Sequence, residues 1–100
     1  MAKREEYSIG RGELLRMLYR MYPDPVADNV IKSTFVWITH GVLDGHAAYL
    51  VESGYAAREE IDRKKWEFST ANYLLKITPK GIQLLEGEID ADPGIELPSI

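Results

Sequence analysis

The stretch AAYLVESGYAAREE, residues 47–60, decides how the rest of the sequence is interpreted. Its first half spaces apolar side chains as a helix does, and Gly54 then provides the residue type that ends helices in the left-handed region. After the glycine, residues 55–61 alternate imperfectly between apolar and polar side chains, which favours a strand. The stretch therefore predicts a helix that runs directly into a β-strand.

The chain before this stretch is expected to add two more helices. Residues 10–22 carry an amphipathic pattern that stops at Pro23 and Pro25, which remove backbone donors and disfavour helix in the residue before them. Residues 26–38 are ambiguous, because their β-branched side chains favour strand whereas their apolar spacing fits a helical stripe. We predict a helix, since no turn signal between 29 and 38 would close a hairpin.

The third helix has two candidate starting points. Thr39 can cap it, and a second interpretation begins it at Asp44 and leaves little more than two turns. In the first interpretation its buried stripe consists of Leu43, Ala47, Leu50 and Val51.

The chain after Gly54 predicts a β-hairpin followed by a last helix. A polar segment, residues 62–72, connects the first strand to residues 73–78, in which alternate side chains occupy one face. Thr78 then caps a helix with Pro79 at its first position. The proposed domain spans residues 10–89, with an N-terminal arm at 1–9 and an acidic, extended tail at 90–100 rich in proline and glycine.

These elements together resemble a winged helix-turn-helix domain. AAYLVESGYAAREE is similar to the passage from third helix to first wing strand, and KITPKGIQLLEGEI, residues 76–89, is similar to the passage into the last helix of PadR-like and MarR-like regulators. A narrower resemblance is to small winged-helix proteins of Mu-like transposable phages. The implied fold class is α+β, with a three-helix core, a two-stranded β-hairpin wing and a C-terminal helix.

Composition limits the function classes. The net charge of −4 argues against a general polyanion binder, and the absence of cysteine excludes thiol catalysis and fits a reducing cytosol. No apolar run approaches the roughly 20 residues that cross a bilayer. Without a phosphate loop or nucleophile elbow, the sequence indicates no enzyme and no cofactor. We expect a cytoplasmic protein without membrane or metal.

The resemblance implies contact with double-stranded DNA, yet the third helix contains no lysine or arginine. Contact is therefore expected from the basic tip of the wing, with support from the first and third helices. The candidate DNA-binding residues are Arg63, Lys64, Lys65, Arg11, Arg16, His40 and His46.

The competing hypothesis is a winged-helix module that binds protein instead of DNA, or forms a homodimer. Exposed aromatic side chains on the wing would suit a protein partner, and the apolar face of the last helix is where proteins of this resemblance often dimerise. The candidate interface residues are Trp66, Phe68, Ile82, Leu85 and Ile89.

Overall fold

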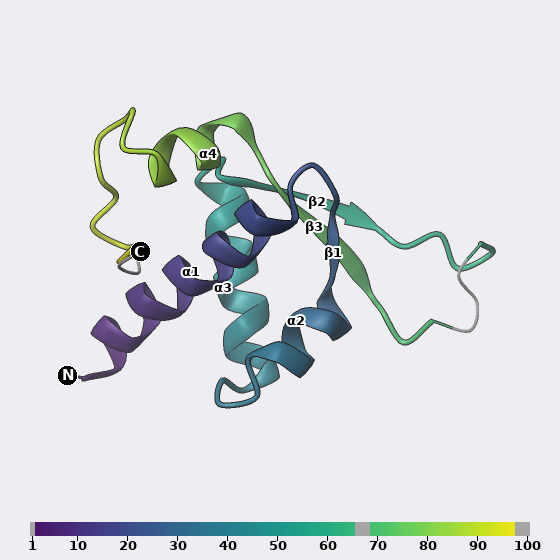
Figure 1. Cartoon of the computed structure of the whole chain (residues 1–100). Coiled ribbons are helices and arrows are strands. Elements are labelled where there is room, and N and C mark those ends of the chain that lie inside the picture. The colour runs from purple at the N-terminus through teal and green to yellow at the C-terminus, as the bar shows by residue number, and fades with distance from the viewer. Residues whose placement is uncertain (1, 66–68, 98–100) are drawn as a thin grey trace.

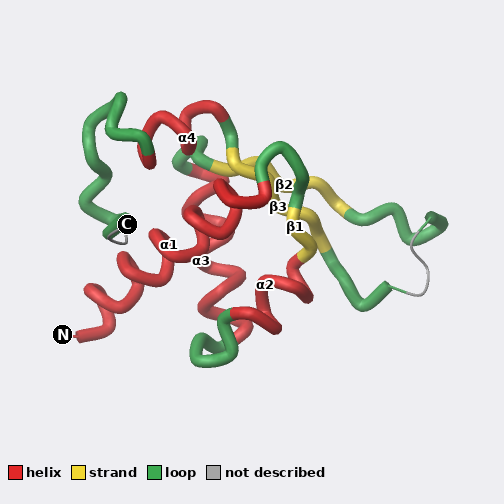
Figure 2. The backbone as a smooth tube through the Cα atoms, viewed as in Figure 1, coloured by secondary structure: helices red, strands yellow, loops and turns green. Residues whose placement is uncertain are grey.

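The computed structural model describes residues 2–65 and 69–97, which form an α+β arrangement of four helices and a three-stranded antiparallel sheet (Figure 1). The order is α1 (Ala2–Met21), β1 (Val26–Ala27), α2 (Asp28–Thr34), α3 (His40–Glu52), β2 (Ala56–Glu60), β3 (Tyr73–Ile77) and α4 (Pro79–Leu85). In both tube and ribbon views, the connection between β2 and β3 extends away from the helices (Figure 2).

The core lies where α1 and α3 pack against the sheet. Leu14, Leu15 and Leu18 of α1 are at most 1% exposed, and the predicted stripe of α3 is buried except for Val51, which is half-buried. β3 is the central strand and pairs antiparallel with both neighbours, so Leu75 faces Val26 on one side and Arg58 on the other. The alternate side chains Tyr73, Leu75 and Ile77 are buried, as the strand pattern predicts.

Helix α1 begins at Ala2, eight residues before the predicted start, so residues 2–9 are helical rather than an arm. Gly10 and Gly12, both within the predicted helix, lie where other segments approach it closely. A Cβ atom on Gly10 would come within 2.6 Å of the His46 Nε2 atom, and one on Gly12 would collide with the backbone of Glu96. Because of these two close approaches, glycine is the residue that fits at both positions, although its helix propensity is low.

The prediction of one helix over residues 26–38 was partly wrong. Val26 and Ala27 form β1, so the sheet has three strands rather than the two of the predicted wing. Helix α2 then occupies only residues 28–34, and residues 35–39 connect it to α3. Residues 26–27 form a strand because β3 pairs with them, and no local sequence pattern reveals that pairing.

The predicted helix boundaries around the hairpin are largely confirmed. Thr39 occupies the N-cap position of α3, although its side chain accepts no capping hydrogen bond. Gly54 adopts a φ of +85° after α3, and the Thr78 side chain accepts a 3.2 Å hydrogen bond from the Gly81 amide at the start of α4. Helix α4 ends at Leu85, so its helical face is shorter than the predicted one, which extended to Ile89.

The acidic C-terminal segment lies against the helices instead of standing free (Figure 1). Ile95 is only 6% exposed, and the Glu96 amide donates a 2.9 Å hydrogen bond to the Ser8 carbonyl of α1. The Asp92 carboxylate accepts hydrogen bonds from the Tyr49 and Tyr55 hydroxyls at 3.0 and 3.1 Å. Residues 92–97 therefore complete the core from outside α1 and α3, which the composition of the tail did not predict.

Candidate functional site

The outer face of α3 is smooth and carries no positive charge from lysine or arginine. Its exposed residues include Gly41, Gly45, Ala48 and Glu52, and a Cβ atom on either glycine would meet nothing within 4 Å. Groups of this kind offer no donors to bases or phosphates in a DNA groove, and a carboxylate repels phosphate. His40 is the one predicted contact residue of α3 that is exposed.

His46 is buried, which corrects its prediction as a DNA contact. Its side chain is 3% exposed and lies edge-on to the Tyr7 ring, with 5.7 Å between ring centroids. Burial, followed by the positive charge of Arg11, lowers the pKa of His46 to about 4. The imidazole is therefore neutral at physiological pH and cannot serve as a cationic phosphate contact.

The Arg11 side chain also interacts with other parts of the same chain. Its guanidinium lies over the Tyr49 ring at 4.0 Å from the centroid and donates a 3.0 Å hydrogen bond to the Gly94 carbonyl. This places Arg11 between α3 and the C-terminal segment rather than toward solvent. Arg16, one and a half turns further along α1, is half-buried and lines a small pocket with Arg20, Thr34 and Phe35.

The basic residues between β2 and β3 are exposed, as predicted. Arg63 is used locally, because its guanidinium donates to the Ser69 carbonyl at 3.2 Å and to the Asn72 side chain at 3.1 Å. Lys64 and Lys65 reach solvent, whereas their backbone amides bond to Asp62. Trp66 and Phe68 lie outside the described residues.

The three aliphatic residues predicted to form a dimer surface pack partly against this chain's own core. Ile82, Leu85 and Ile89 are half-buried beside the buried Leu84. They leave less apolar surface for a partner than the helical pattern suggested.

A buried carboxylate ties α2, α3 and β3 together, and the sequence did not signal it. Asp28 is 1% exposed and accepts hydrogen bonds from the Asn72 amide at 2.7 Å and from Lys32 at 3.1 Å. Lys32 also pairs with Asp44 at 3.1 Å, which in turn accepts a 2.7 Å hydrogen bond from the Tyr73 hydroxyl. Burial alone would raise the pKa of Asp28, but the hydrogen bonds outweigh it and hold that pKa below its usual value.

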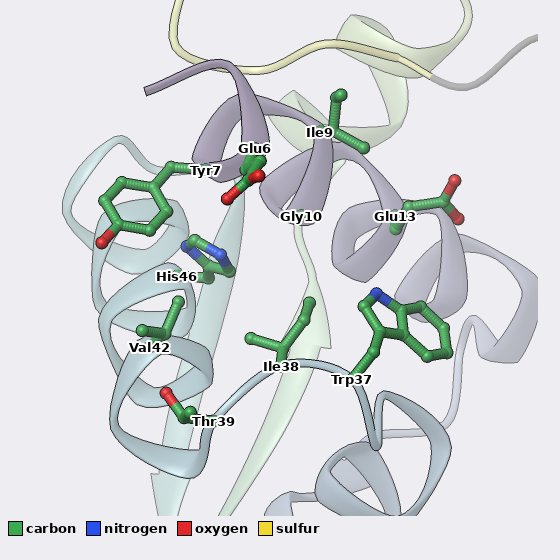
Figure 3. Close-up of a pocket in the computed structure, with 10 residues that line it drawn as sticks. All are labelled: Glu6, Tyr7, Ile9, Gly10, Glu13, Trp37, Ile38, Thr39, Val42 and His46. Carbon is green, nitrogen blue, oxygen red and sulfur yellow. The ribbon is translucent and has the colours of Figure 1, made fainter. Parts of the chain in front are cut away.

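An apolar groove lies between the first half of α1, the α2–α3 connection and α3 (Figure 3). It encloses about 590 Å³. Its walls are mainly apolar, and two carboxylates stand among them. The described lining residues are Glu6, Tyr7, Ile9, Gly10, Glu13, Trp37, Ile38, Thr39, Val42 and His46.

One of the groove's lining residues, Trp37, is strongly exposed, as is its sequence neighbour Val36. Trp37 is 70% exposed and Val36 is 77% exposed, the largest values among the exposed large hydrophobic residues described. The Trp37 ring is held by an edge-on contact with the buried Phe35, at 5.4 Å between centroids. Residues 36–38 were predicted to be helical, but α2 ends at Thr34, and nothing in the sequence indicated that Trp37 would be exposed beside a groove.

Over residues 2–65 and 69–97, no group of three or more histidine or acidic side chains is placed to hold a metal ion. None of the helices in that part of the chain combines the length and apolarity needed to span a membrane.

Comparisons of this chain with models of protein families, with curated proteins and with solved structures found no significant match.

Proposed function

We propose that this chain is a noncatalytic winged-helix module that acts by docking onto another protein through the apolar groove. The observation that carries the proposal is the 70% exposure of Trp37, which lines a groove of about 590 Å³. Exposed aromatic anchors next to a concave apolar surface are typical of protein interfaces, where tryptophan often supplies much of the binding energy.

The winged-helix assignment is supported by the order of elements. Three helices precede the β2–β3 hairpin and a short helix follows it, and β1 adds a strand beside β3. That arrangement is compatible with a small winged helix, in which α3 would be the recognition helix.

Two further observations favour protein over DNA as the main partner. Two of the predicted DNA contacts, Arg11 and His46, are engaged inside the molecule, and α3 exposes glycine, alanine and glutamate. Since nonspecific DNA affinity depends on cationic side chains that displace counterions from phosphates, this surface lacks the main source of that affinity.

The docking proposal is tested by selecting binders from an unbiased library of displayed 16-residue peptides. Wild-type protein should enrich defined sequences whose binding is lost with Trp37→Ala and retained with Val30→Ala. Val30 provides the matched control because it is 49% exposed on α2 and is absent from the described groove lining. Enriched peptides that bind all three proteins equally would place the interface elsewhere and refute the proposal.

A second candidate function is contact with double-stranded DNA through the β2–β3 hairpin. The specific observation in its favour is that Lys64 and Lys65 are exposed where the hairpin extends away from the helices (Figure 1). Fluorescence polarisation with a mixed-sequence duplex tests it. Binding that weakens with salt and disappears in Lys64→Glu/Lys65→Glu would support DNA contact, and no binding at low salt would exclude it.

A further inference from the structure

We infer that the occupant of the apolar groove is a cationic amphipathic segment of a partner protein. Its apolar side chains fill the groove and cover Trp37, while its lysine or arginine side chains meet Glu6 and Glu13. This inference rests on the proposed docking function and adds the chemistry of the partner.

The first argument is the charge around the groove. Glu6 and Glu13 stand on the same side of α1, seven residues and about two helical turns apart, and both line the groove (Figure 3). The described lining residues include no lysine or arginine. Any peptide seated here therefore passes two carboxylates and no fixed positive charge, which favours lysine or arginine beside its apolar face.

The second argument concerns the neighbouring ionisable groups. His46, on the α3 side of the groove, is uncharged at physiological pH because burial and Arg11 lower its pKa. Arg11 is turned toward Tyr49 and the Gly94 carbonyl, so its charge is not presented to the groove. Arg16 and Arg20 line a separate pocket further along α1, which Glu13 also borders. The negative charge is thus clearest at the Glu6 end.

The third argument concerns size and shape. About 590 Å³ is enough for one or two large apolar side chains and is also within the range of small-molecule sites. However, a small ligand confined to the groove would leave most of Trp37 in water. A helical or extended segment can fill the groove and also cover Trp37, and so removes more apolar surface from water.

The test uses two defined 18-residue amphipathic helical peptides with the same leucine stripe. One has lysine and the other has glutamate at all its polar positions. Fluorescence anisotropy at physiological salt measures their affinity for the full chain. Because a protein with net charge −4 attracts any cationic peptide, the key comparison is between two variants that each remove two carboxylates.

Glu6→Gln/Glu13→Gln removes the groove carboxylates, and Glu59→Gln/Glu88→Gln removes two exposed carboxylates elsewhere. The lysine peptide should bind wild type and lose about threefold to tenfold in affinity with the groove pair, as expected for two exposed ion pairs, but much less with the control pair. Trp37→Ala should cost about 30-fold, the loss that defines an interface anchor. Val36→Ser provides a second apolar variant, since Val36 is almost fully exposed and its replacement leaves the core intact.

Different failures separate the inference from the proposed function. Equal binding of both peptides, or preference for the glutamate peptide, with sensitivity to Trp37→Ala would overturn the cationic partner and leave groove docking intact. Equal effects of the two carboxylate pairs would also overturn it, because attraction would then be nonspecific. Self-association of the chain that is lost in Trp37→Ala would make a second copy the occupant. No binding sensitive to Trp37 or Val36 would refute docking at this groove.

Discussion

Lowering the pH from about 7.5 to about 5 should destabilise this protein through His46. Protonation of the buried imidazole is disfavoured in the folded chain, where its pKa is lowered to about 4, whereas the unfolded chain protonates it near the ordinary value of about 6.5. The unfolded state therefore binds the proton more tightly between these values. The stabilising effect of the neutral imidazole is fully present above about pH 6.5 and is lost as the pH falls toward 4.

The magnitude follows from the difference between the two pKa values. One pKa unit corresponds to roughly 1.4 kcal/mol, so a displacement from about 6.5 to about 4 gives ~3 kcal/mol when the pH reaches the lower value. At about pH 5 the loss should be ~2 kcal/mol. The carboxylates of Asp28 and Asp92 do not contribute in this window, because their pKa values are lowered and their effect is lost only at more acidic pH.

Urea denaturation at the two pH values measures this loss as a change in the free energy of unfolding. Wild type and His40→Gln should both lose about 2 kcal/mol, because His40 is exposed and its replacement leaves the buried imidazole in place. His46→Gln should be less stable at neutral pH but nearly independent of pH over this range. An NMR titration that gives His46 a pKa near 6.5, or equal pH dependence in all three proteins, would refute the reasoning.

Three other substitutions test the contacts that shape the molecule. Gly12→Ala should cost about 1–3 kcal/mol and speed proteolysis within residues 92–97, because a Cβ atom there collides with the Glu96 backbone; unchanged proteolysis would count against the docked segment. Asp28→Ala should cost about 2 kcal/mol or more in urea denaturation, because it leaves buried donors without a partner; a neutral effect would mean that water replaces the carboxylate. Tyr49→Phe and Tyr55→Phe should each cost about 1 kcal/mol through loss of a hydrogen bond to Asp92, and additive losses in the double variant would contradict a shared acceptor.

Local sequence signals predicted the parts of the fold that depend on local chemistry. Gly54 has the backbone conformation that its residue type favours, Thr78 caps α4, and alternate residues of β3 are buried. The misjudged parts depend on contacts between distant segments. Strand β1 exists because β3 pairs with it, and residues 92–97 are docked because Gly12 of α1, more than eighty residues earlier, leaves room for the Glu96 backbone. No pattern within a short window contains that information.

The candidate site could not be predicted from the sequence for a related reason. Aromatic residues in a domain this small are usually part of the core, so Trp37 gave no sign of being exposed. The structure ends α2 at Thr34, and the α2–α3 connection buries Phe35 while it leaves the next two side chains in solvent. The prediction for His46 was wrong in the opposite sense. His46 was expected to be exposed on the outer face of α3, but it is buried against Gly10.

The groove and the C-terminal segment share the first half of α1, and this links the candidate site to the rest of the fold. On one side, Tyr7, Ile9 and Gly10 line the groove; on the other, the Ser8 carbonyl accepts a hydrogen bond from the Glu96 amide, and Arg11 donates one to the Gly94 carbonyl. The first turns of an isolated helix fray readily, since their gain in packing is small. Here the C-terminal segment packs against those turns, so under the docking proposal the groove is already formed when a partner binds. A preformed groove saves a partner the entropic cost of ordering it.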